Sequence, residues 1–137
     1  MATPFTFPVR IYYEDTDAGG VVYYANYLKF MERARTEWLR AHGFEQDQLI
    51  EEYGVIFAVR SANISYQAPA RFNDLLEVSA TLLKVGRASL SLTQEVRRAG
   101  EEQVLCEATV KAASLDAERF RPKAMPAPLY DAITQQL

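Results

Sequence analysis

The segment from Asn26 to Ala41 constrains the fold more than any other part of the chain, because its apolar residues recur at the spacing of one helix face. The residues on this face are Tyr27, Leu28, Phe30, Met31, Ala34, Trp38 and Leu39. Asn26 is predicted to be the N-cap, and His42-Gly43 provides a stop signal, since glycine accepts the left-handed turn that ends a helix. A helix with so strong an apolar face is expected to be buried against a sheet.

The rest of the chain consists mostly of strand-like segments. Strands are predicted over residues 5–13, 55–66, 75–85, 88–98 and 104–115, because aromatic and β-branched residues alternate there between turn signals. Pro8 marks the first strand as an edge strand or an irregular one. A second, shorter helix is expected over residues 44–53, closed by Gly54, and a helical tail over residues 129–137.

Short turns join the last three strands, so these strands are expected to form an antiparallel meander. The order is then strand, long helix, short helix and four strands, without an internal repeat or a linker. One long apolar helix on one face of an antiparallel sheet is an α+β architecture. The sequence predicts a single domain over residues 1–137.

The joint between the first strand and the long helix concentrates the chemistry of the chain. It holds Glu14, Asp15 and Asp17, followed by the glycine pair Gly19 and Gly20. A carboxylate can act as a nucleophile or a general base, and free N–H groups at a helix start can stabilise a developing negative charge. Taken on loop chemistry alone, Asp17 fits an Asx-turn or N-cap role as well as a catalytic one.

Composition excludes several other classes of function. The net charge of −3 and the absence of a basic block argue against nucleic-acid binding. No apolar run approaches the roughly 20 residues of a membrane span. The sequence has one histidine and one cysteine, far apart, which do not make a zinc ligand set. It also lacks the glycine-rich phosphate loop that would indicate a nucleotide cofactor. A single cysteine and the lack of a secretory signal favour the cytoplasm.

The joint also carries a family resemblance. The run Glu14–Tyr27, followed by Phe30–Arg35, resembles the 4-hydroxybenzoyl-CoA thioesterase family, and it looks closest to the bacterial acyl-CoA thioesterases encoded beside the Tol-Pal envelope system. The segments Tyr66–Asp74 and Arg119–Pro122 resemble that family too. The likeness extends over about Val9 to Pro126.

This resemblance implies a hotdog fold, in which the sheet wraps around the long helix. It also implies a homodimer or homotetramer with active sites between protomers, and cleavage of acyl-CoA thioesters without a metal or cofactor. The family's catalytic carboxylate falls on Asp17, and the backbone N–H that polarises the carbonyl falls on Tyr24. Many members of the Tol-Pal branch carry histidine where this chain has Tyr24, so imidazole chemistry from that position is absent here.

The remaining site assignments come from the residue types. Gly19 and Gly20 are expected to let the backbone approach the substrate, and Tyr23 to contact it. Arg87, beside a glycine in a turn, is the favoured contact for CoA phosphates. Weaker phosphate candidates are Arg60, Arg71, Lys84 and Arg97. Structural roles are expected for the other notable residues, which are Glu14, Asp15, Asn26, Tyr27, His42 and Cys106.

The sequence therefore predicts an acyl-CoA thioesterase acting on a short-chain or aromatic acyl group. The alternative is a non-catalytic or weakly catalytic module that binds acyl-CoA or acyl carrier protein in lipid or envelope metabolism. A hotdog dehydratase ranks lower, since it would use a histidine paired with a carboxylate. The sequence leaves open whether Asp17 attacks the thioester directly or activates water.

Overall fold

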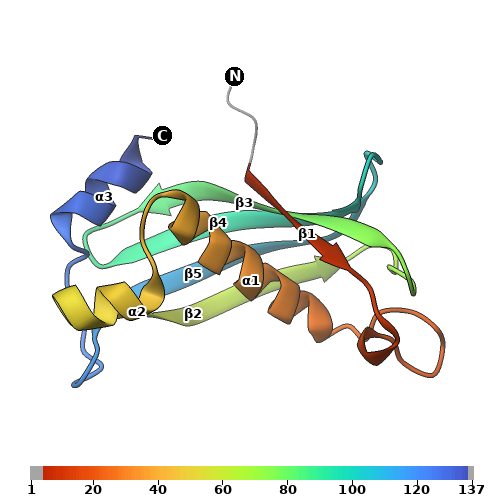
Figure 1. The fold of residues 1–137 in the computed structure, drawn as a ribbon, viewed down its shortest axis with the longest axis horizontal. Coiled ribbons are helices and arrows are strands. Elements are labelled where there is room, and N and C mark those ends of the chain that lie inside the picture. Colours follow the sequence, from red (N-terminus) through yellow and green to blue (C-terminus); the bar gives the residue numbers. More distant parts are fainter. Residues whose placement is uncertain (1–4, 136–137) are drawn as a thin grey trace.

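The computed structural model describes residues 5–135, which form one antiparallel sheet and the helices packed on it (Figure 1). The strands are β1 (Phe5–Arg10), β2 (Val55–Tyr66), β3 (Leu75–Val85), β4 (Ser89–Arg98) and β5 (Val104–Asp116). The helices are α1 (Asn26–Ala41), α2 (Gln46–Gln48) and α3 (Ala127–Thr134), with a 3-10 turn η1 (Tyr13–Asp15) and a π-helical turn η2 (Leu49–Tyr53).

The sheet has the strand order β1-β3-β4-β5-β2, and every neighbouring pair is antiparallel. The helix α1 lies across its concave face (Figure 1). The α+β class, with a sheet curved around one long helix, is confirmed, and so is the meander of β3, β4 and β5. Pro8 lies opposite Glu77 on the edge strand β1. Proline is tolerated on edge strands because one side of such a strand forms no hydrogen bonds to a neighbouring strand.

Most predicted boundaries hold, and the differences have local causes. The first strand ends at Arg10 rather than at residue 13, because Tyr13–Asp15 turns into the 3-10 helix. The predicted second helix begins at Gln46 and consists of α2 followed by η2, and it is closed by Gly54, whose φ of 65° favours glycine. The tail helix starts earlier than predicted, at Ala127, and the final residues 136–137 of that prediction lie outside the described residues.

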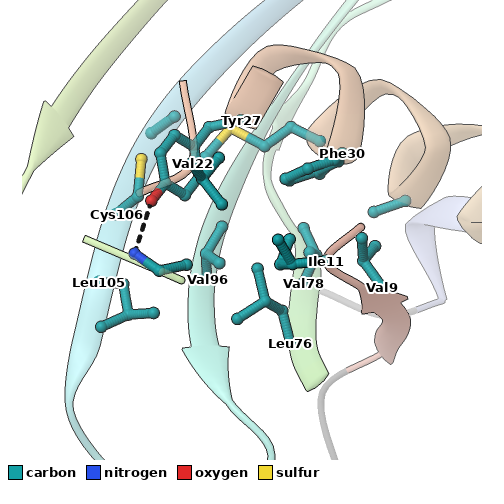
Figure 2. Packing of buried hydrophobic residues seen from close by; sticks show 14 of the residues in the cluster. Val9, Ile11, Val22, Tyr27, Phe30, Leu76, Val78, Val96, Leu105 and Cys106 are labelled. Atoms are coloured by element: carbon teal, nitrogen blue, oxygen red, sulfur yellow. Dashed lines mark hydrogen bonds between the residues drawn. The ribbon is translucent and has the colours of Figure 1, made fainter. Parts of the chain in front are cut away.

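The apolar face of α1 forms the centre of the core. Of the seven residues predicted there, Leu28 is the exception, since it is 44% exposed, whereas the other six are buried. Figure 2 shows this face meeting side chains from the sheet. The sheet residues in that cluster include Val9, Leu76, Val78, Val96, Leu105, Cys106, Ala108 and Val110. Packing against β1 and β3 fixes the direction of α1 and hence the position of its N-terminus.

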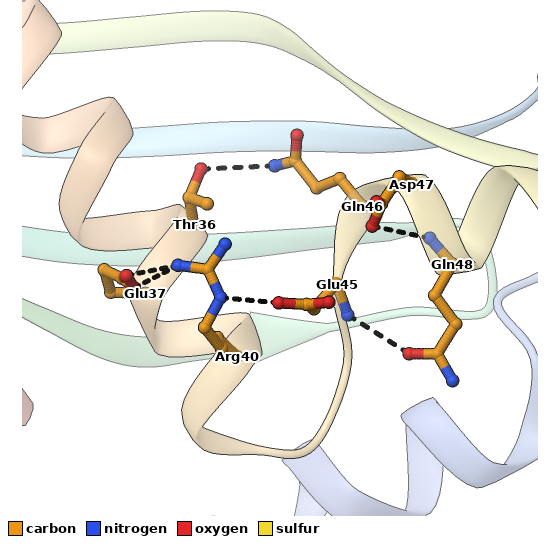
Figure 3. Close-up of polar contacts among 7 residues, drawn as sticks. All are labelled: Thr36, Glu37, Arg40, Glu45, Gln46, Asp47 and Gln48. Atoms are coloured by element: carbon orange, nitrogen blue, oxygen red, sulfur yellow. Dashed lines mark hydrogen bonds and ion pairs between the residues drawn. The ribbon is translucent and has the colours of Figure 1, made fainter.

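A polar network joins the C-terminal half of α1 to α2 (Figure 3). Arg40 pairs with Glu37 in its own helix, and its Nε donates to Glu45 at 2.9 Å. Gln46 donates to the Thr36 hydroxyl at 3.4 Å. Because these charges are exposed, the network adds little stability and mainly sets where α2 sits.

One buried hydrogen bond fastens the start of α1 to a distant loop. The Tyr27 side chain is 3% exposed, and its hydroxyl accepts from the backbone N–H of Ala70 at 3.0 Å, as Figure 2 shows. Burial also raises the pKa of Tyr27, so the phenol stays neutral. The expected structural role of Tyr27 is confirmed.

Replacing Tyr27 by phenylalanine is expected to lower the free energy of unfolding by about 1–3 kcal/mol, because the buried N–H of Ala70 loses its acceptor. Urea unfolding followed by circular dichroism measures this loss. Tyr13→Phe is the matched control, since that side chain is 76% exposed. Equal stability of both variants would show that the Tyr27–Ala70 bond contributes nothing.

Candidate active site

The loop between β1 and α1 folds into a narrow hairpin. Asp15 accepts the N–H of Tyr12 through its side chain at 2.8 Å, and Thr16 pairs with Val22. Within the tip, the Asp17 N–H donates to the carbonyl of Val21 at 2.9 Å, and the N–H of Gly20 donates to the carbonyl of Asp17 at 3.0 Å. The hairpin holds Asp17 at its tip and returns the chain to the start of α1.

The glycines of the tip have two different reasons to be glycine. Gly20 has a φ of 78°, in the left-handed region that other residues rarely adopt. Gly19 has ordinary backbone, but a Cβ there would lie 3.3 Å from the Asp17 carboxylate oxygen Oδ1. A side chain at Gly19 would therefore crowd that carboxylate.

Asp17 is exposed, and Oδ1 of its carboxylate accepts the N–H of Gly19 at 2.8 Å. This contact is the Asx-turn that loop chemistry suggests for the position. It occupies one carboxylate oxygen and leaves Oδ2 without a hydrogen-bond partner among residues 5–135. The turn thus orients the carboxylate through Oδ1 alone.

The start of α1 carries two donors without acceptors. The first turn is closed by bonds from the N–H of Asn26 to Tyr23, of Tyr27 to Tyr24 and of Leu28 to Ala25. The N–H groups of Tyr24 and Ala25 precede these bonds and have no acceptor within the described part of the chain. Such free N–H groups carry the positive end of the helix dipole.

The prediction that Asn26 is the N-cap is wrong. Ala25 occupies the N-cap position, no side chain caps the helix there, and Asn26 is the first helical residue. Its buried amide instead donates to the carbonyl of Asp15 at 2.9 Å. Asn26 therefore links the loop that carries Asp17 to the helix start, and its side chain does not accept from the free N–H groups of Tyr24 and Ala25.

Aromatic side chains surround the helix start. Tyr24 and Tyr66 meet edge to face, and the Tyr66 hydroxyl donates to the carbonyl of Tyr24 at 3.2 Å. Beside them lies a hollow of about 280 Å³, lined by Val22, Tyr24, Tyr27, Tyr66, Gln67, Ala68 and Pro69. Tyr23 is 45% exposed, and the neighbouring Tyr24 phenol raises its pKa, so Tyr23 is neutral near pH 7.

Arg87, the residue predicted to contact the CoA phosphates, does not lie near this loop within the protomer. It sits in the turn between β3 and β4, whereas the loop follows β1 at the opposite end of the sheet (Figure 1). Arg71, a weaker candidate from the sequence, pairs with Val21 in the loop itself. Pairing of segments 50 residues apart in the sequence brings Arg71 there, so composition and spacing gave no signal for preferring it.

His42 lies away from the loop, whereas Cys106 lies in the core cluster that also contains Val22 of the loop and Tyr27. The Nδ1 atom of His42 is 2.7 Å from the carbonyl oxygen of Trp38 at the far end of α1, which confirms a structural role. Cys106 is fully buried, and burial, with the nearby Glu107 charge second, raises the pKa of its thiol from 9.0 to about 12. A neutral buried thiol is no nucleophile.

This thiol makes folding sensitive to alkaline pH. Above about pH 9 the unfolded chain releases the Cys106 proton before the folded chain does, so stability falls as pH rises toward 12. We expect wild type to lose up to about 1.4 kcal/mol per pH unit more than Cys106→Ala across this window. Urea midpoints measured for both proteins at several pH values test this, and parallel curves would contradict it.

Two absences complete the description. Among residues 5–135, no group of three or more His, Cys, Asp or Glu side chains is placed to hold a metal ion. No helix in the same range has both the length and the apolar character needed to cross a membrane.

Comparison with known proteins decides the family. The family model described as Thioesterase superfamily matches residues 19–105. The chain belongs to the thioesterase superfamily. A relative from Escherichia coli O6:H1, the acyl-CoA thioester hydrolase YbgC, is 48% identical over 124 residues, which cover 90% of this chain and 91% of the relative.

Solved structures of thioesterases share the fold. A probable thioesterase from Bartonella henselae has a TM-score of 0.85 at 32% identity, covering 90% of this chain and 100% of that one. A structure of 4-hydroxybenzoyl-CoA thioesterase has a TM-score of 0.88 and covers 96% of this chain and 99% of that one. Because the identity is only 24%, this likeness shows the fold alone. The expected family and the hotdog fold are both confirmed.

Proposed function

We infer that this superfamily member is an acyl-CoA thioester hydrolase, and we propose that residues 1–137 form its single domain. Its relative in Escherichia coli carries that activity in its name. The observation that carries the proposed site is local. One short hairpin holds a carboxylate with a free oxygen, at Asp17, and leads directly into two N–H donors without acceptors, at Tyr24 and Ala25.

In this proposal the thioester carbonyl oxygen accepts from the free N–H groups at the start of α1. These donors stabilise the negative charge that grows on the oxygen as the carbonyl is attacked. Asp17 then acts in one of two ways. As a general base it takes a proton from water, whose oxygen attacks the carbonyl carbon; as a nucleophile it forms a mixed anhydride that water cleaves. In both, the C–S bond breaks and the thiolate of CoA leaves.

The two routes differ in where solvent oxygen goes. In a single turnover in ¹⁸O-labelled water, a mixed anhydride that water opens at the Asp17 carbonyl leaves label in the Asp17 carboxylate and none in the released acid. General-base catalysis places label only in the released acid. Mass spectrometry of the peptide that contains Asp17 reads this difference.

The substrate is proposed to be a short-chain or aromatic acyl-CoA, with the acyl group beside Tyr24 in the hollow of about 280 Å³. Tyr23, Gly19 and Gly20 are proposed to contact it. For the CoA phosphates, Arg71 lies beside the loop in the same protomer. Arg87 stays a prediction that requires a second copy to bring it near.

A turnover panel tests the proposal. Purified protein is expected to release thiol from acyl-CoAs in a series from acetyl to dodecanoyl and benzoyl, detected with a thiol reagent. The same acyl groups on acyl carrier protein show which carrier is used. Absence of thiol release from every member would refute the proposed activity.

A homodimer or homotetramer is part of the proposal. The outer side of the edge strand β2 has no strand partner among residues 5–135, and its residues Val59 and Tyr66 are 51% and 44% exposed. Exposed strand edges favour pairing with another chain. Light scattering at assay concentration is expected to give an oligomer mass, and a monomer that is fully active would contradict an interface site.

We also propose a cytoplasmic location, which cell fractionation tests.

A further inference from the structure

A second cavity lies between the C-terminal half of α1 and the sheet. It encloses about 140 Å³, and its lining includes Arg35, Trp38, Phe57, Leu90, Leu92 and Ala112. Four of these are apolar wall residues from β2, β4 and β5. The sheet side of the cavity is therefore apolar, and the helix brings Glu32, Arg35 and Trp38 to its lining.

Arg35 is a partly buried cation without a carboxylate partner. Its Nη1 donates to the Gln94 side-chain oxygen at 3.0 Å, and it forms no ion pair with any residue in 5–135. Burial lowers the pKa of Arg35, while the charge of Glu32, which also lines the cavity, opposes that shift. Most of the five guanidinium donors thus have no acceptor from the described residues.

The hydrogen bonds of the Gln94 amide fix the position of its side-chain oxygen. The side chain is fully buried, and its NH₂ group donates to the carbonyls of Met31 at 3.0 Å and Ser79 at 3.3 Å. These two acceptors fix the orientation of the amide, so its oxygen must face Arg35. Gln94 therefore holds the guanidinium in place without neutralising it.

Trp38 supplies a second free donor. The side chain is 1% exposed and lines the cavity, and its indole N–H has no acceptor among the described residues. A buried donor without an acceptor costs about 1–3 kcal/mol, so buried polar groups are normally paired. The indole nitrogen itself has almost no accessible surface, so the guanidinium of Arg35, which lines the cavity without an ion pair to any described residue, is the group that indicates a bound acceptor carrying negative charge.

We propose that this cavity binds a small monocarboxylate, with its carboxylate on Arg35 and its apolar body against Phe57, Leu90 and Leu92. The flat guanidinium donates in a fork that matches a carboxylate. A cavity of roughly 150 Å³ with apolar walls accepts a molecule the size of benzene, so the body is a phenyl ring or a chain of about five carbons.

This site is distinct from the one proposed for hydrolysis. Arg35 follows Asn26, the first residue of α1, by nine residues, which is about 13 Å along the helix axis. The binding needs no acyl-CoA and goes beyond the proposed function. If that function holds, the site recognises the chemical class of its product, because thioester hydrolysis releases a carboxylate.

Binding can be measured on the whole chain without CoA. Trp38 is the only tryptophan, so its fluorescence reports on the cavity directly. Hexanoate and benzoate are expected to give saturable changes, and the neutral hexanamide and benzamide to bind about tenfold more weakly or worse, since they lack the charge-assisted bond. Calorimetry on the same samples detects binding that leaves the fluorescence unchanged. No binding of either acid, or equal binding of acid and amide, would overturn the proposal.

Two variants on the same helix sharpen the test. Arg35→Gln is expected to weaken hexanoate binding by about tenfold or more and to leave hexanamide binding unchanged. Arg33→Gln, an exposed neighbour, is the matched control and is expected to bind hexanoate as wild type does. Wild-type affinity for hexanoate in folded Arg35→Gln would overturn the assignment. The acid and amide comparison in wild type decides the question if Arg35→Gln does not fold.

Discussion

Asp17→Asn is expected to lower kcat for acyl-CoA hydrolysis by about 10²–10⁴-fold, the range in which a positioned proton-transfer group contributes. The substitution removes the charge and basicity of the carboxylate but keeps its shape. An asparagine oxygen can still accept the N–H of Gly19, the contact that Oδ1 of Asp17 makes at 2.8 Å. The loop should therefore keep its turn, and the loss should appear in turnover rather than in folding.

Glu14→Gln is the matched control for this experiment. Glu14 is an exposed carboxylate three residues earlier in the same loop, and its side chain makes no hydrogen bond or ion pair within residues 5–135. It is expected to keep near-wild-type turnover. Equal losses in both variants would indicate a general effect of loop charge, and the role assigned to Asp17 would be withdrawn.

Tyr24→Pro is expected to lower kcat by about 10²–10³-fold, the usual effect of removing one oxyanion donor. Proline has no N–H, and the N–H of Tyr24 serves no bond in the described structure. The bond from Asn26 to the Tyr23 carbonyl at 2.9 Å makes Tyr24 the second residue of a turn, a position where proline is favoured. The variant should thus lose the donor with little change in the fold.

Tyr24→Ala separates the backbone from the side chain. It loses the ring as Tyr24→Pro does but keeps the N–H, so it is expected to turn over much faster than Tyr24→Pro. Thermal unfolding of both variants checks that the helix start is intact. A folded Tyr24→Pro protein with unchanged kcat would exclude this N–H from the oxyanion site.

Local patterns predicted the elements well because their causes are local. The bounds Asn26–Ala41 of α1 agree with the prediction, since helical periodicity and the His42-Gly43 stop signal both lie within the segment itself. The meander of β3, β4 and β5 followed from short turns. The importance of the hairpin at Asp17 came from a family resemblance as much as from the residues, because Asp before glycine in a turn is common.

Features that depend on distant partners were not predictable. Asn26 was predicted to cap the helix, but its side-chain amide donates to the Asp15 carbonyl, a contact that exists only once the loop has folded back. Arg71 reaches the loop through pairing with Val21, whereas nothing in the spacing of Arg87 showed that it lies at the other end of the sheet. The contact between Arg35 and Gln94 likewise joins residues 59 apart in sequence.

The most direct test of the account is a single-turnover measurement with folded Asp17→Asn in excess over its best acyl-CoA. Calorimetry first establishes that the variant binds the acyl-CoA, and quenched samples then follow release of the acid over time. The account predicts binding close to that of wild type with hydrolysis slowed by about 10²-fold or more. Tight binding followed by hydrolysis at the wild-type rate would contradict it.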